Sequence, residues 1–279
     1  MALGVEGRHH RVPVPGGHMA VHDVGDGAPV VLLHGIPGSG ATWDGVVARL
    51  RTSFRVLVPD LLGFAMSSRP ASGAMLLADR QADALAVALD ALAVGRVAVV
   101  GHDFGGPVAL LLSAARPDLV DRLGLLATNA FPDTPVPFPL STVRWPGVGA
   151  LARLLLFSRP AQRMMVRAGT GGSARRLDPA PYLGDIGQSR AVATIFAAGL
   201  RDLAERYAPV EDALCGIEVP LFVGWGDRDP FFPIEQGERT ARAAGTRLRV
   251  YRGAGHFLPE ERAAEVAADL ARLCDRSRA

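Results

Sequence analysis

The 279-residue chain is 49% hydrophobic, has a formal net charge of +2, and takes all 30 of its cationic residues as arginine. A chain of this length is expected to form one large α/β domain with an insertion, or two small domains. Because its charges nearly balance and no cluster of basic residues stands out, the sequence does not indicate a nucleic-acid-binding surface. The absence of lysine excludes Schiff-base chemistry, lysine-anchored pyridoxal phosphate and a Walker A lysine.

Two features bear on location and cofactors. Cys215 and Cys274 lack metal-ligand spacing, so they are interpreted as reduced thiols of a reducing compartment or as residues without a role in function. Residues 1–11 show no apolar signal core, and no apolar stretch is long enough to span a membrane. We therefore expect a cytoplasmic monomer or homodimer with no cofactor, no metal, no nucleic-acid partner and no membrane partner.

The first half of the chain alternates predicted strands and helices. Strands are predicted at residues 10–14, 19–24, 29–33, 54–58, 96–100 and 120–127. Helices are predicted between them at residues 43–50, 76–94 and 107–115. This order is typical of βαβ units and predicts an α/β fold with a mostly parallel, twisted sheet flanked by helices.

After Asn129 the alternation stops. Four prolines follow within residues 131–139, and the sequence as far as Cys215 is rich in Arg, Leu and Ala, which predicts several helices interrupted at residues 169–173. Strands resume at residues 219–225 and 248–251, with helices at 233–244 and 259–274. We predict a core domain of residues 1–130 and 216–279 with a helical cap of residues 131–215. A second independent domain is the alternative, which its small size disfavours.

A sharp turn joins the strand at residues 96–100 to the helix at 107–115. Gly101, Gly105 and Gly106 supply the space that such a turn needs. The layout is that of the G-x-S-x-G nucleophile elbow, with Asp103 at the apex in place of serine. Nearby amides and the helix N-terminus favour an ionised carboxylate, which can attack carbon. Alternatively, Asp103 only caps the helix.

Two later loops supply partners for Asp103. Asp227 and Asp229 follow the strand at residues 219–225, and His256 follows the last strand. The carboxyl ends of parallel strands meet at one edge of a sheet, so these side chains can converge. The order acid, carboxylate, histidine matches Ser…Asp…His with serine replaced, which predicts that His256 is a catalytic base rather than a surface residue.

Five motifs together resemble the aspartate-nucleophile branch of the α/β-hydrolase fold superfamily, which contains epoxide hydrolases and haloalkane dehalogenases. They are residues 34–37 (HGIP), 60–64 (DLLGF), 101–106 (GHDFGG), 226–229 (GDRD) and 255–257 (GHF). The resemblance covers nearly the whole chain, and it is more specific for the fold and the Asp-His-Asp triad than for the substrate.

The resemblance implies further roles. The triad acid is the second aspartate, Asp229, and Asp227 is then a turn residue bonded to its own backbone, although the sequence leaves the reverse assignment open. The oxyanion hole uses the backbone amides of Ile36 and Phe104. Ala65 departs from the usual Gly-Phe-Gly-x-Ser pattern, which slightly restricts that loop.

The implied reaction has two steps. Asp103 attacks an electrophilic carbon and forms an ester, and His256 then activates water to hydrolyse it. An epoxide oxygen needs a proton as it leaves, which tyrosines supply in epoxide hydrolases. Tyr251 lies in a predicted strand, so Tyr182 and Tyr207 are the candidate acids in the cap, although either could be a packing residue.

Haloalkane dehalogenase activity is the alternative. Dehalogenases usually hold the halide with a Trp after the nucleophile and a second Trp or an Asn. The corresponding positions here are Phe104 and Ile36, although Trp145 could supply one contact. An esterase or C–C hydrolase would need serine at position 103, and a non-catalytic binding protein would not need the triad. The apolar cap suggests a small hydrophobic substrate; its large apolar residues are Leu154, Leu155, Leu156, Phe157, Met164, Met165, Ile195 and Phe196.

Overall fold

The computed structural model describes residues 4–134, 136, 138, 140–145, 147–172, 177–179 and 182–275. Its strands are β1 (Arg8–Val14), β2 (Gly17–Val24), β3 (Ala28–Leu33), β4 (Phe54–Asp60), β5 (Val97–His102), β6 (Val120–Leu126), β7 (Leu221–Gly226) and β8 (Leu248–Tyr251). They form one sheet in the order β1-β2-β4-β3-β5-β6-β7-β8. Only the pairs β1–β2 and β2–β4 are antiparallel, which confirms the predicted mostly parallel sheet.

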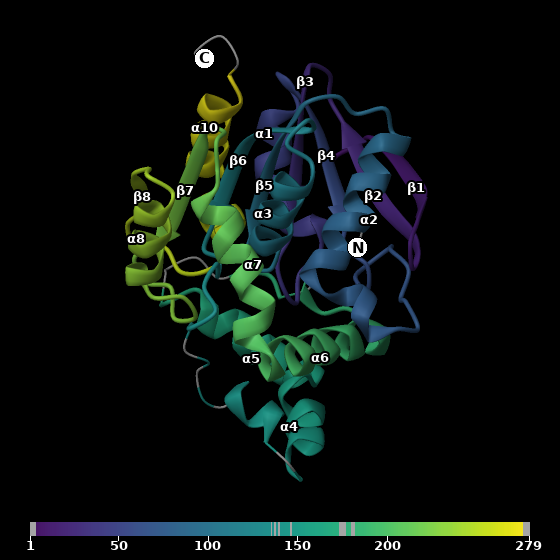
Figure 1. Ribbon diagram of the computed structural model, residues 1–279, viewed down its shortest axis with the longest axis vertical. Coiled ribbons are helices and arrows are strands. Elements are labelled where there is room, and N and C mark those ends of the chain that lie inside the picture. The colour runs from purple at the N-terminus through teal and green to yellow at the C-terminus, as the bar shows by residue number, and fades with distance from the viewer. Residues whose placement is uncertain are drawn as a thin grey trace.

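Helices flank this sheet on both faces (Figure 1). The helices of the described chain, including those that lie beyond the sheet, are η1 (Gly40–Trp43), α1 (Asp44–Leu50), η2 (Gly73–Leu76), α2 (Ala78–Ala91), α3 (Gly105–Ala115), η3 (Leu140–Arg144), α4 (Gly149–Leu156), α5 (Arg159–Gly169), α6 (Ile186–Arg201), α7 (Leu203–Cys215), α8 (Ile234–Ala243), α9 (Leu258–Glu261) and α10 (Ala263–Cys274). The single closing helix predicted at 259–274 is wrong in one respect. Arg262, at φ −130°, leaves the helical region and divides it into α9 and α10.

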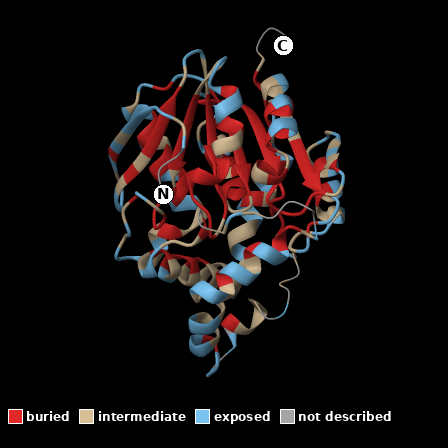
Figure 2. Ribbon diagram, turned by 180° about the vertical axis from the view of Figure 1, so that it is seen from behind, coloured by how far each residue is buried: buried red, intermediate tan, exposed pale blue. Residues whose placement is uncertain are grey.

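Alternate residues of the central strands face two separate apolar layers. Val31 and Leu33 of β3 pack into the layer that contains α2 and α3, whereas Val30 and Leu32 pack into the layer that contains α1 and α10. Successive side chains of a strand point to opposite faces, so a central strand covered on both faces must be apolar throughout. Figure 2 shows the strands as the buried centre of the molecule.

The segment between β6 and β7 carries η3 and α4 to α7. These helices lie at one end of the sheet, with α4 farthest from it (Figure 1). Two of them begin at side-chain caps: Ser158 accepts a hydrogen bond from the amide of Ala161, and Asp185 accepts one from that of Gln188. The several helices predicted for this segment are therefore present. Prolines 135, 137 and 139 and residue 173 lie outside the described residues.

None of the described helices combines the length and the apolar character that a bilayer crossing requires.

Candidate active site

The turn after β5 holds Asp103 in a backbone conformation that few non-glycine residues adopt. Its φ is +51°, which costs on the order of 1 kcal/mol and lifts the side chain above the sheet edge. Neighbouring glycines permit this turn. A Cβ on Gly101 would lie 2.2 Å from the carbonyl oxygen of Gly105, and one on Gly106 would lie 2.0 Å from Thr128 Oγ1. Thr128 Oγ1 in turn donates to the carbonyl oxygen of Asp103 at 2.6 Å.

The Asp103 carboxylate contacts two groups from other loops. Its Oδ1 accepts a hydrogen bond from the Ile36 amide at 2.7 Å, and its Oδ2 lies 3.5 Å from His256 Nε2. A Cβ on Gly35 would lie 2.4 Å from Asp103 Cβ, so glycine is needed for this close approach. Burial alone would raise the pKa of Asp103, but His256 and the Ile36 amide outweigh it and hold the pKa below its usual value.

His256 is fixed on its other side by Asp229. Its Nδ1 donates to Asp229 Oδ2 at 2.8 Å, and Asp229 Oδ1 accepts the amides of Phe231 and Phe232 at 2.8 and 3.0 Å. These bonds orient the carboxylate, and the carboxylate orients the imidazole so that Nε2 faces Asp103. The structure therefore brings together the three side chains predicted as a triad.

The charges around His256 control its protonation. Burial by itself lowers the pKa of the imidazole, but the carboxylates of Asp229 and Asp103 outweigh it and raise the pKa to about 10. At neutral pH the resting site therefore contains an imidazolium between two carboxylates. Neutralising Asp103 would remove one of the two causes that hold the pKa of His256 up.

Two buried residues that the sequence analysis did not single out support the histidine loop. Glu261 accepts the amides of Gly255 and Phe257 at 2.9 and 3.1 Å, and His102 Nε2 donates to the carbonyl oxygen of His256 at 2.8 Å. Burial lowers the pKa of His102 to about 4, so it is a neutral donor. Glu261 follows His256 by five residues and His102 directly precedes Asp103. This closeness to predicted site residues was the only indication in the sequence that they support the site.

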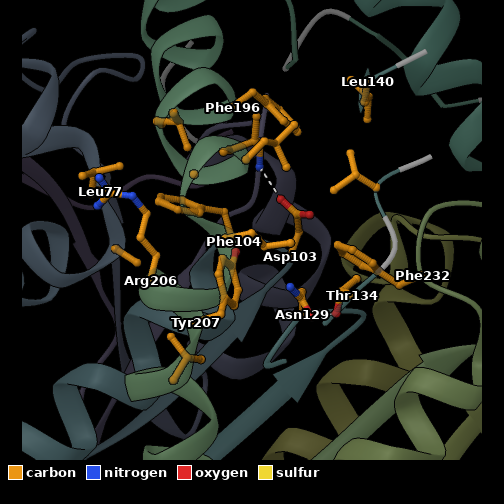
Figure 3. Close-up of a pocket in the computed structure, with 18 of the residues that line it drawn as sticks. Leu77, Asp103, Phe104, Asn129, Thr134, Leu140, Phe196, Arg206, Tyr207 and Phe232 are labelled. Atoms are coloured by element: carbon orange, nitrogen blue, oxygen red, sulfur yellow. Dashed lines mark hydrogen bonds between the residues drawn. The ribbon is translucent and has the colours of Figure 1, made fainter. Parts of the chain in front are cut away.

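A cavity of about 380 Å³ opens on Asp103 and His256 (Figure 3). The residues that follow β3, β5 and β6 form one side of it, and α5, α6 and α7 form the other. Most of its lining is apolar, and the larger aliphatic and phenylalanine members are Ile36, Leu77, Phe104, Leu111, Leu140, Met165, Ile195, Phe196, Leu200, Leu203, Phe231, Phe232 and Phe257. Of the apolar residues predicted to suit a hydrophobic substrate, only Met165, Ile195 and Phe196 line this cavity.

The two candidate tyrosines occupy different places. Tyr207 lines the cavity, and its hydroxyl interacts electrostatically with Asp103 and with the side chain of Asn129. Figure 3 shows the three residues together. Burial and the Asp103 charge raise the pKa of Tyr207 well above its usual value, so it keeps its proton at neutral pH. Tyr182 is not among the cavity residues, and its hydroxyl donates to Glu260.

Four further positions considered in the sequence lie at or near the loops around Asp103 or in the segment after β6. Asp227 is exposed, and its Oδ1 accepts the amide of Gly253 at 2.6 Å, so it holds a neighbouring loop instead of its own backbone. Phe104 is the N-cap residue directly before α3 and lines the cavity, whereas Trp145 is half-exposed and does not line it. Ala65 has φ +38°, the left-handed region that favours glycine, which explains why a glycine is usual there.

Comparison with known proteins agrees with this architecture. A family model described as alpha/beta hydrolase fold matches residues 28–148. The chain is 31% identical over 256 residues to an uncharacterised protein of Mycobacterium tuberculosis, covering 88% of this chain and 74% of that protein. It is also 31% identical over 255 residues to a 2-hydroxymuconate semialdehyde hydrolase of Pseudomonas sp., covering 88% and 87%. The chain belongs to the α/β-hydrolase fold family.

Further relatives include enzymes of the predicted classes. A soluble epoxide hydrolase of Corynebacterium sp. is 29% identical over 280 residues, covering 93% of this chain and 94% of that enzyme. Among solved structures, the epoxide hydrolase CorEH matches with a TM-score of 0.78 at 24% identity, covering 95% and 98% of the two chains. The haloalkane dehalogenase DbeA of Bradyrhizobium elkani matches with a TM-score of 0.80 at 22% identity, covering 96% and 97%. These structural matches establish the fold.

Proposed function

We propose that the protein opens an apolar epoxide to a diol through a covalent ester on Asp103. One observation carries this proposal: the Asp103 carboxylate, the His256 imidazole and the Tyr207 hydroxyl share one apolar cavity. These are the nucleophile, base and acid that the reaction requires. In this proposal residues 131–215 form a cap, whose helices α5 to α7 close the cavity above Asp103.

The first step forms the ester. An oxygen of Asp103 attacks an epoxide carbon, the carbon–oxygen bond of the ring breaks, and Tyr207 donates its proton to the leaving oxygen. Proton donation matters because an alkoxide expelled into an apolar cavity is very unfavourable. The raised pKa of Tyr207 keeps this proton available.

The second step hydrolyses the ester. An ester on Asp103 carries no charge, so the pKa of His256 falls from its resting value. The imidazolium then gives up its proton, which restores the Tyr207 hydroxyl, and the neutral imidazole can accept a proton from water. That water attacks the ester carbonyl carbon, and the amides of Ile36 and Phe104 stabilise the oxyanion. Collapse of this intermediate expels the second diol oxygen, which takes the proton from His256. The carboxylic acid left on Asp103 then passes its proton to His256, which restores the resting carboxylate and imidazolium.

The alternative of halide removal has less support in the cavity. A departing halide needs N–H donors, yet none of the three tryptophans of the chain is among the cavity residues. Asn129 Nδ2 already donates to the carbonyl oxygen of Phe131 at 3.2 Å. The Pseudomonas relative's name describes a hydrolase of a semialdehyde, but an aspartate at the apex does not favour the acyl-serine route of esterases and C–C hydrolases.

Trapping the ester tests the proposal. The His256→Gln variant, incubated with styrene oxide, should gain the mass of one substrate molecule on Asp103, because alkylation proceeds and water is not activated. A single turnover of the wild type in ¹⁸O-labelled water should place the label in Asp103, and Asp103→Ala should fold normally and lose turnover.

An alkyl bromide with halide detection is run beside the epoxide. Label found only in the diol would refute the ester mechanism, and bromide turnover without epoxide turnover would favour a dehalogenase. Normal activity of Asp103→Ala would reduce Asp103 to a helix cap. Ligand binding without turnover of either substrate would favour a binding protein.

A further inference from the structure

The end of the molecule farthest from the sheet combines exposed apolar side chains with an excess of positive charge. We define the tip face as the outward-facing residues Trp145, Val148, Leu151, Leu154, Leu155 and Met164, which lie on or beside α4 and α5. Each is a large exposed hydrophobic side chain, and Leu154 is 72% exposed. Figure 1 shows α4 projecting from the molecule, and Figure 2 shows how little of it is covered.

The apolar residues of α4 form one stripe. Val148, Leu151 and Leu155 have the i, i+3, i+7 spacing of a single helix face, and Leu154 adjoins them. The described chain leaves about half or more of each of these four side chains uncovered, since their exposed fractions run from 49% at Val148 to 72% at Leu154. Exposed apolar patches rimmed by polar residues mark interaction sites on soluble proteins.

The charge of the surrounding sequence is one-sided. Between Asp133 and Asp178 the chain has seven arginines and no aspartate or glutamate. On α5, Arg159, Arg163 and Arg167 are exposed at i, i+4, i+8 spacing, which places them along one side of the helix. Among the described residues, no carboxylate forms an ion pair with these three arginines.

We propose that the tip face docks on a membrane surface rich in anionic lipid. Arginines bind the headgroups while Trp and Leu side chains enter the boundary between headgroups and acyl chains, which is how amphipathic surface helices bind. A second copy of this chain fits less well, because an isologous contact would bring two cationic surfaces together. The proposal revises the expectation that the chain has no membrane partner, and it does not depend on the proposed reaction.

Docking at the tip face would also bring the cavity close to the lipid. Leu140 of η3 and Met165 of α5 line the cavity, and these two elements flank α4. An apolar substrate dissolved in the bilayer would then reach the cavity without crossing bulk water. This route deepens the proposed function, but the docking itself is measured without any substrate.

The test uses the full chain and vesicles of equal parts phosphatidylcholine and phosphatidylglycerol. Trp145 is the only exposed tryptophan, because Trp43 and Trp225 are fully buried, so binding should shift its emission to shorter wavelength and protect it from acrylamide. Arg163→Gln with Arg167→Gln should lower partitioning about 30-fold at low salt, since each arginine contributes about 1 kcal/mol.

Serine substitutions complete the test. Replacing both Leu154 and Leu155 by Ser should lower partitioning by at least about tenfold, through lost apolar burial. The matched controls are exposed residues elsewhere, Met66→Ser with Val87→Ser and Arg242→Gln with Arg247→Gln, which should bind like the wild type. All variants should retain the wild-type melting temperature, because every altered side chain is exposed.

Four results would overturn the proposal. The wild type could show no vesicle binding at low salt, or the tip-face variants could bind as well as the controls. Sedimentation could show a dimer that the leucine substitutions dissociate, without vesicle binding, which would assign the tip face to a second copy. Binding to soluble polyglutamate that the leucine substitutions leave unchanged would point to an acidic protein partner.

Discussion

Replacing Tyr207 by phenylalanine removes one hydroxyl from the cavity and leaves the ring. If Tyr207 protonates the leaving oxygen, the ester-forming step with an epoxide should slow by about 10²- to 10⁴-fold, the usual loss for a general acid. The fold should persist, because phenylalanine keeps the ring and loses only the interaction of the hydroxyl with Asn129, worth at most about 0.5–1.5 kcal/mol. Rapid-quench measurement of ester formation, with thermal unfolding in parallel, separates the two effects.

Tyr182→Phe is the matched control for this experiment. It removes a buried tyrosine hydroxyl that bonds Glu260 and does not line the cavity. We expect it to keep near-normal ester formation, and an alkyl bromide should react equally well with both variants because a halide leaves without a proton. Full epoxide activity in Tyr207→Phe would refute the tyrosine-acid mechanism, and a selective loss in Tyr182→Phe would assign the acid to the other tyrosine.

Three further predictions concern the elements around Asp103. Asp229→Asn should lower kcat for the epoxide by roughly 10⁴-fold, because it removes the partner that orients His256. Asp227→Asn should keep a kcat close to that of the wild type, because Asp227 bonds the Gly253 amide instead. Equal losses in the two variants would contradict the assignment of Asp229 as the triad acid. Because the pKa of His256 is higher in the folded protein than in the unfolded chain, its protonation stabilises the fold fully below pH 6.5, and this stabilisation is lost as the pH rises through about 10. In urea titrations over this range, the free energy of unfolding of the wild type should therefore fall relative to that of His256→Gln. Parallel curves for the two proteins would contradict this. Gly106→Ala should destabilise the fold by about 1–3 kcal/mol, because its Cβ would lie 2.0 Å from the side-chain oxygen of Thr128. In the same assay, Gly199→Ala in α6 should raise the free energy of unfolding by about 0.5–1 kcal/mol, because its Cβ would enter open space.

The sequence by itself determined the architecture and the order of the candidate residues. Apolar runs of strand length between amphipathic stretches predicted the parallel sheet, because a strand covered on both faces has little choice of residue. The glycines around Asp103 predicted a tight turn, and the structure confirms it with a positive φ at the apex. Both predictions rest on local sterics and periodicity, which a single sequence carries.

Tertiary structure alone decided which distant side chains meet. Tyr182 and Tyr207 were equivalent in the sequence, and only the packing of the inserted helices places one in the cavity and the other on Glu260. Likewise, the apolar residues of the inserted segment divide into cavity lining and an exposed face on α4, although both groups look alike along the chain. Helical periodicity states that a face is apolar, but what covers that face depends on contacts between segments far apart in sequence.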